Sequence, residues 1–177
     1  MVGKLVATLD QVGHYTQQPQ TWAGTAVALA VGGGRKGRRA ALRGSACYAI
    51  TSVITNLLIK PLVDRSRPSG AHEGGLGPLT SSFPSGHAAS DLAFTFGAAQ
   101  ELPALFFPLA AATFPAHWSL VRSHGHHVSD VVFGGVVGIV VAWVVWRRWP
   151  VAHGDEDRTG RPSGKRSSDD RPRAGVS

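Results

Sequence analysis

Cysteine is almost absent from this 177-residue sequence, which contains only Cys47. A disulfide within the chain is therefore excluded, and so are the zinc and redox motifs that need several cysteines. Acidic residues are also scarce, since 11 Asp and Glu stand against 18 Lys and Arg and give a formal net charge of +7. A basic chain suits a nucleic-acid or a membrane-surface partner, so the positions of the charges must decide between the two.

The charges are concentrated at the C-terminal end. Residues 151–177 contain six Lys or Arg and five Asp or Glu among Gly, Pro and Ser, with almost nothing apolar. Such a segment cannot bury enough surface to offset its chain entropy, so we predict a disordered, charged tail. The remaining residues 1–150 form one predicted domain with twelve basic and six acidic residues in an apolar background. This domain is typical of a membrane protein and not of a nucleic-acid-binding one.

Uncharged runs predict membrane-spanning helices. Residues 102–121 contain no Asp, Glu, Lys or Arg, and residues 131–146 are almost wholly Val, Gly, Trp and Ala. The first run has the roughly 20 residues that cross a bilayer, and the second reaches this length with its flanks. Shorter apolar runs at 21–34, 44–59 and 86–100 are rich in small and hydroxyl residues, which are common where membrane helices pack together. We predict an all-α, polytopic bundle of about five transmembrane helices, with a surface helix before them.

The basic residues orient these helices, because Lys and Arg in short loops stay preferentially in the cytoplasm. The basic run 35–43, predicted to be a loop, and the pair Arg147 and Arg148 are both placed there, together with the tail. The loops 64–84 and 122–129 then lie on the extracytoplasmic side of the cell membrane. The polar residues that suggest chemistry are in these two loops or at the helix ends beside them.

The first such motif is a pair of cations, Lys60 and Arg67. They stand seven residues apart, which is two turns and one face of a helix, before Pro68 ends the segment. Two permanent cations that face one point would bind an anion. The alternative is positive charge at a helix end near lipid headgroups, which is favourable there without any ligand.

The second motif is Pro84-Ser85-Gly86-His87, which leads from a loop into a helix. Ser85 is predicted to cap this helix, and Gly86 lets an anion approach the free N–H groups of the first turn. An ordinary capped turn with a hydrogen-bonded His87 is the alternative. Asp91, one turn later, could tune His87 as an acid or pair with a neighbouring helix. We interpret it as a solvated or paired helix-start carboxylate outside the site.

The third motif places His126 and Asp130 four residues apart at the start of the last helix. A carboxylate at this spacing can hydrogen-bond one ring nitrogen and leave the other as a nucleophile or base. The alternative is a metal site made of His124, His126 and His127. Adjacent histidines point about 100° apart on a regular helix, which disfavours that site, and we predict no metal or cofactor.

In this order, the three segments resemble the signature of the type 2 phosphatidic acid phosphatase superfamily, which includes lipid phosphate phosphatases and vanadium haloperoxidases. That signature is Lys, six residues and Arg-Pro; then Pro-Ser-Gly-His; then Ser-Arg, five residues, His, three residues and Asp. The positions of this sequence that match are Lys60, Arg67, Pro68, Pro84, Ser85, Gly86, His87, Ser119, His126 and Asp130.

The resemblance implies an integral-membrane phosphatase that acts on a lipid phosphate without a metal. His126 would attack phosphorus to form a phosphohistidine, Asp130 would orient His126, and His87 would protonate the departing oxygen. The groups that would hold the phosphoryl oxygens are Lys60, Arg67, Ser85 and the N–H of Gly86.

One position departs from the signature, because Leu120 stands where the family has the Arg of the third motif. We expect Arg122 to take this role, since a buried phosphate site without it would lose a charge-assisted contact of about 2 kcal/mol. The alternative is a catalytically weak membrane protein that binds phospholipid headgroups without turnover. A haloperoxidase is disfavoured by the short chain and its membrane character. Phosphatidic acid, phosphatidylglycerol phosphate and polyprenyl phosphate or diphosphate all remain candidate substrates, and the oligomeric state is not predicted.

Overall fold

The computed structural model describes residues 18–63, 65–68 and 81–150, together with isolated positions among the first 17. All regular structure in these residues is helical. The α-helices are α2 (Pro19–Gly32), α3 (Gly34–Val53), α4 (Gly86–Glu101), α5 (Phe106–Arg122) and α6 (Val128–Arg148). The predicted all-α bundle is therefore confirmed. Of the predicted N-terminal surface helix only isolated positions are described, and these are helical. The charged tail predicted after residue 150 lies outside the described residues.

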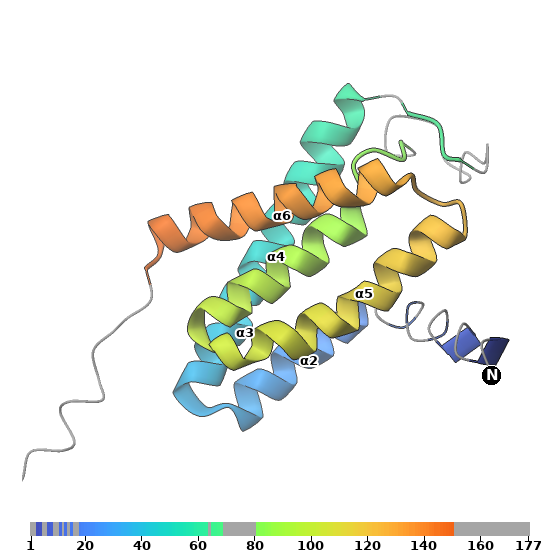
Figure 1. Ribbon diagram of the computed structural model, residues 1–177. Helices are drawn as coiled ribbons and strands as arrows, with labels where there is room; N and C mark the ends of the chain where they lie inside the picture. Colours follow the sequence, from blue (N-terminus) through green and yellow to red (C-terminus); the bar gives the residue numbers. More distant parts are fainter. Residues whose placement is uncertain are drawn as a thin grey trace, which may run out of the picture.

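Helix α4 lies at the centre of the bundle (Figure 1). Helices α3, α5 and α6 pack around it, and α2 packs against α3. Fully buried alanines of α4, among them Ala88, Ala89 and Ala93, allow its neighbours to come close. Phe94 from the same helix packs against Trp22 of α2, with the ring centroids 5.0 Å apart.

Three helical segments are long and apolar enough to cross a membrane: Gly34–Leu62, Pro103–Arg122 and Val128–Arg148. The second of these includes a 3₁₀ turn, Pro103–Leu105, before α5. Helices α2 and α4, with 14 and 16 residues, are shorter than a typical span. Large apolar side chains are exposed along the long segments, as expected where helices face lipid tails. The chain is therefore a helical membrane bundle.

Helix α3 begins earlier than the sequence predicts. The basic run 35–43 is helical and not a loop, and Gly33 alone separates α2 from α3. Two glycines make this tight turn possible, because Gly34 has a φ of +59° and a Cβ on Gly33 would collide with Gly37. Lys and Arg are good helix formers, so the basic run continues as helix once the turn is made.

Arg43, inside α3, forms a buried ion pair with Glu101 at the C-terminal end of α4. Its Nε and Nη2 lie 2.9 and 2.8 Å from the same carboxylate oxygen. The guanidinium also donates to the backbone carbonyl of Trp149 and lies 4.8 Å from the centroid of the Trp149 ring. These contacts join α3, α4 and the end of α6 at the end of the bundle where α4 finishes.

Two glycines of α6 allow it to lie directly against the start of α4. A Cβ on Gly134 would collide with the carbonyl oxygen of Ser85, and a Cβ on Gly138 with that of Ala89. Residues four apart share a helix face, so both glycines present the small surface by which membrane helices pack closely. This contact places the N-terminus of α6 beside the N-terminus of α4.

Replacing Gly138 by alanine is expected to destabilise the protein by about 1–3 kcal/mol, because the added methyl group must push α6 away from α4. Unfolding of the protein in detergent would measure the change. Gly24→Ala in α2 is the matched control, since a Cβ there meets no atom within 4 Å. Alanine also favours helix over glycine, so this control should be neutral or stabilising. Equal stability of the two variants would contradict the packing argument.

Candidate active site

A cavity of about 450 Å³ lies at the end of the bundle where α4 begins. All three sequence motifs contribute to it, through Lys60, Arg67, Gly86, His87 and His126. The other residues that line it are Pro19, Tyr48, Ser52, Asn56, Ser90 and Leu120. Residues that are far apart in the sequence therefore meet around one space.

The two cations reach this cavity by a different route from the predicted one. After α3 the chain passes through a π-helical turn, Ile54–Ile59, and a 3₁₀ turn, Lys60–Leu62, and the helix then ends. Pro61 lacks the N–H that would continue an α-helical ladder. Arg67 thus stands in an irregular segment, where its Nη1 donates to the carbonyl oxygen of Gly125 at 3.0 Å. The prediction of one helix through Lys60 and Arg67 is wrong, although both side chains line the cavity.

Ser85 caps α4 as the sequence predicts, since its Oγ accepts a hydrogen bond from the Ala88 N–H at 3.4 Å. The side chain of Ser85 is fully buried, and it is Gly86 and His87 that line the cavity. A Cβ on Gly86 would lie 3.1 Å from Oδ1 of Asn56. Glycine therefore keeps the start of α4 open at the cavity.

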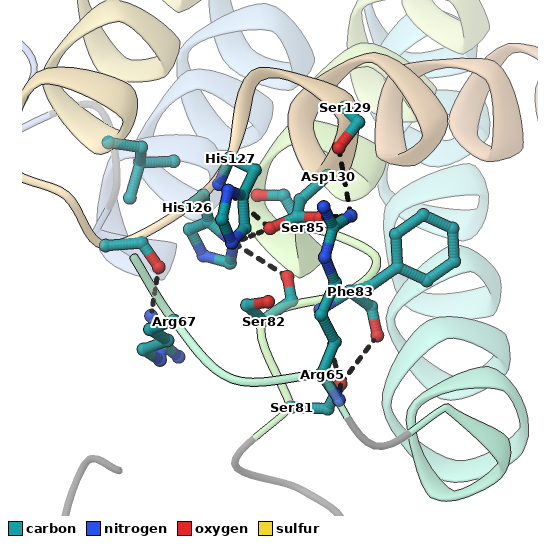
Figure 2. Close-up of polar contacts among 12 residues, drawn as sticks. Arg65, Arg67, Ser81, Ser82, Phe83, Ser85, His126, His127, Ser129 and Asp130 are labelled. Atoms are coloured by element: carbon teal, nitrogen blue, oxygen red, sulfur yellow. Dashed lines mark hydrogen bonds and ion pairs between the residues drawn. The ribbon is translucent and has the colours of Figure 1, made fainter. Parts of the chain in front are cut away.

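His126 is buried, with 4% of its surface exposed, in the loop between α5 and α6. Its Nδ1 lies 2.8 Å from the backbone carbonyl oxygen of Ser82 (Figure 2). A carbonyl oxygen only accepts, so Nδ1 carries the proton and donates it. Nε2 is then the unprotonated nitrogen of the neutral ring, which is the form that a nucleophile requires.

Asp130 contacts different groups from those predicted. Its Oδ2 lies 3.9 Å from Nδ1 of His126, beyond a hydrogen bond, because the carbonyl of Ser82 occupies that nitrogen. Oδ2 instead accepts from the backbone N–H of His127 at 2.9 Å, and Oδ1 from Nη1 of Arg65 at 2.7 Å. The predicted hydrogen bond from Asp130 to His126 is therefore not formed. Asp130 acts on His126 through its charge and through the loop that it holds.

Arg65 is a site residue that the sequence reasoning missed. Its guanidinium contacts both Asp130 and the hydroxyl of Ser129, the latter at 2.9 Å (Figure 2). It also lies 6.0 Å from the centroid of the Phe83 ring. In an extended segment residues two apart turn to the same side, so a segment without helix places Arg65 on the side of Arg67, toward the site. That period of two was the available signal, and the assumption of a helix concealed it.

Leu120 lines the cavity, whereas Arg122 does not. Two residues on a helix differ by about 200° in direction, and the side chain of Arg122 is exposed at the end of α5. Arg122 therefore does not take the place of the missing Arg in this structure. The cations that line the cavity are Lys60 and Arg67.

The cavity presents two cations, the first turn of a helix, and an imidazole with a free nitrogen, which together suit a phosphate ester. Among the described residues, no group of three or more His, Cys, Asp or Glu side chains is arranged to hold a metal ion.

A family model, that of the PAP2 superfamily, matches residues 41–153. The chain belongs to the PAP2 superfamily. This match covers more than half of the chain and all three motifs, and PAP2 membership indicates phosphatase activity on phosphate esters. Comparisons with curated proteins and with solved structures gave no match.

Burial and the positive charge of Arg67 lower the pKa of His126 to about 4, and Lys60 acts in the same direction. A lowered pKa keeps the ring neutral in mildly acidic solution. We therefore expect NMR of isotope-labelled histidine to show a neutral His126 ring at pH 6, protonated on Nδ1. If the His126 ring of the wild type titrated near pH 6.5, burial and Arg67 would not lower its pKa as expected.

Removal of the nearby charge tests the cause of the shift. Arg67→Gln should raise the pKa of His126 toward its ordinary value of about 6.5, because a positive neighbour disfavours the protonated ring. The exposed Arg122 is a matched control, and Arg122→Gln should leave the titration of His126 unchanged.

Proposed function

We propose that this PAP2 protein is an integral-membrane lipid phosphatase that hydrolyses a phosphomonoester or diphosphate of a lipid. The reaction passes through a phosphohistidine at His126 and uses no metal. The observation that carries the proposal is the buried His126, whose Nδ1 is held by the Ser82 carbonyl while the ring lines a cavity with Lys60 and Arg67.

In the proposed reaction, Nε2 of His126 attacks phosphorus and the bond to the leaving oxygen breaks. His87 gives its proton to that oxygen, and it later accepts a proton from the water that hydrolyses the phosphohistidine. Lys60, Arg67 and the N–H of Gly86 stabilise the charge on the phosphoryl oxygens. All five residues line the same cavity.

A second, apolar cavity supports a lipid as the substrate. It has a volume of about 160 Å³ and shares Pro19 and Tyr48 with the phosphate cavity. Its walls include the rings of Trp22 and Phe94. A polar space that shares part of its wall with an apolar one suits a molecule with a phosphate head and a hydrocarbon chain. Phosphatidic acid, phosphatidylglycerol phosphate and polyprenyl phosphate or diphosphate all have this form.

The proposed location is the cell membrane, with the active site on the extracytoplasmic side. The basic residues at the start of α3 and the pair Arg147 and Arg148 at the end of α6 lie at the helix ends away from the cavity. Basic residues beside spanning helices favour the cytoplasm, which supports this orientation.

Release of inorganic phosphate from a lipid phosphate in detergent, with a metal chelator present, tests the function. His126→Ala should abolish turnover and the formation of an acid-labile phosphoenzyme, since it removes the nucleophile. The exposed His124 is the control, and His124→Gln should retain turnover. Full activity of His126→Ala would contradict the phosphohistidine mechanism. Loss of wild-type activity in the presence of the chelator would favour a metal site.

A second candidate function, the binding of phospholipid headgroups without turnover, is favoured by Leu120. This apolar side chain lines the cavity where the family signature has Arg. A phosphate there lacks one charge-assisted contact. Robust turnover by the wild type would eliminate this candidate.

Leu120→Arg should restore the missing contact. Charge-assisted hydrogen bonds contribute roughly 1.5–3 kcal/mol, so we expect the affinity for inorganic vanadate or phosphate to rise by about tenfold or more. Isothermal titration would measure it, with the size-conserving Leu120→Met as the control. Equal affinities of the two variants would show that position 120 does not contact the anion.

A further inference from the structure

Asp91 is a buried carboxylate that the proposed reaction does not use. It lies on α4, one turn after His87, and only 1% of its surface is exposed. Among the described residues, no hydrogen-bond partner is present for either of its oxygens. Of the two interpretations from the sequence, a solvated or a paired carboxylate, the solvated one is therefore wrong. A buried charge without compensation is costly, so this one needs an explanation.

The groups around Asp91 come from three other helices. Nε2 of His117, on α5, is 3.6 Å from Oδ2 and has no hydrogen-bond partner itself. Tyr48 of α3 and Trp22 of α2 also face the carboxylate. His117 and Trp22 favour the ionised form of the carboxylate, which its burial opposes. We take these groups to keep Asp91 negatively charged.

His87 and Asp91 repeat the spacing of His126 and Asp130, a histidine followed four residues later by an aspartate at the start of a helix. The two aspartates differ in their partners, because Asp130 is paired with Arg65 at 2.7 Å. Among the described residues, no guanidinium is paired with Asp91. Its charge acts on His87, one turn away on the same helix.

His87 needs such a charge for the role of an acid. It shares its cavity with Lys60 and Arg67, and both of these disfavour a positively charged imidazole. A bound phosphate offsets part of this repulsion. The carboxylate of Asp91, one helical turn away from the His87 ring, offsets a further part of this repulsion and is present before the substrate binds.

Resting on the proposed function, we propose that Asp91, held by His117, is a positioning residue that keeps His87 protonated and oriented toward the leaving oxygen. As the bond from His126 to phosphorus forms, the bond from phosphorus to the leaving oxygen breaks and the His87 proton passes to that oxygen. The water that hydrolyses the phosphohistidine returns a proton to His87. Asp91 itself exchanges no proton.

The dependence on the leaving group tests this role. A lipid alkoxide needs an acid to leave, whereas the p-nitrophenolate of p-nitrophenyl phosphate leaves without one. We expect Asp91→Asn, measured on the full chain in detergent, to slow release of the lipid alcohol from the lipid phosphate in a single turnover by about tenfold or more. It should slow the single-turnover release of p-nitrophenolate by less than about twofold, because only this first step needs the acid. KM should change little, because Asp91 does not line the cavity.

Further variants separate this role from a structural one. His87→Ala should show the same selective loss, and adding Asp91→Asn to it should cause no further loss if both act in one step. His117→Gln should repeat the selective loss, because the buried Asp91 charge is costly without its partner. Glu101→Gln is the matched control, since it removes the other buried carboxylate of α4 and should affect both substrates equally.

The outcomes distinguish the two proposals. An Asp91→Asn loss that is equal for both substrates, as for Glu101→Gln, overturns the positioning role while the phosphatase activity stands. If the wild type releases phosphate from neither substrate, the proposed function is overturned, and the role of Asp91 with it.

Discussion

The three segments of the active site are held together by one buried residue, Asp130. Its carboxylate contacts Arg65 from the first segment and the N–H of His127 from its own, and its backbone carbonyl accepts from the N–H of Ser85 at 2.9 Å. A fully buried carboxylate must stay paired, because an uncompensated charge in the interior is strongly destabilising. The demand for pairing therefore fixes the first segment against the third, and the backbone hydrogen bond to Ser85 fixes the second. His126 receives its position from this junction, through the loop that ends at His127 and through the Ser82 carbonyl.

This junction requires close contact between two helices that both begin at the cavity. Gly134 lets the backbone of α6 lie against the carbonyl of Ser85, and Gly138 does the same one turn further along. The positive ends of the α4 and α6 dipoles consequently lie at the same end of the bundle as Lys60 and Arg67. An anion is attracted there, and a positively charged imidazole is disfavoured. The positive charges that suit the cavity to phosphate thus act together with burial to lower the pKa of His126.

The sequence predicted the helices well, because an uncharged run of about 20 residues forms few structures other than a membrane-spanning helix. The order of the three motifs predicted which residues would meet. The prediction failed where two sequence patterns indicated different structures. The basic run 35–43 was predicted to be a loop because Lys and Arg are common in cytoplasmic loops. Its residues also favour helix, and the glycines before it allow the turn. The partner of His126 was not predictable, because the Ser82 carbonyl is a backbone group 44 residues away and has no side-chain signature. Arg65 escaped notice because the segment from Lys60 to Arg67 is not a helix.

The proposed chemistry makes opposite demands on two histidines that share one cavity. His126 must be neutral to attack, whereas His87 must be charged to donate, and Lys60 and Arg67 repel a charge on either ring. Each histidine has an aspartate four residues later, so spacing alone does not distinguish them. The difference lies in what each aspartate contacts. Asp130 is paired with a guanidinium and lies beside a ring that burial and Arg67 keep neutral, whereas Asp91, among the described residues, is paired with the imidazole of His117. In the proposed reaction, two pairs of the same sequence spacing thus have opposite protonation states within one positive site.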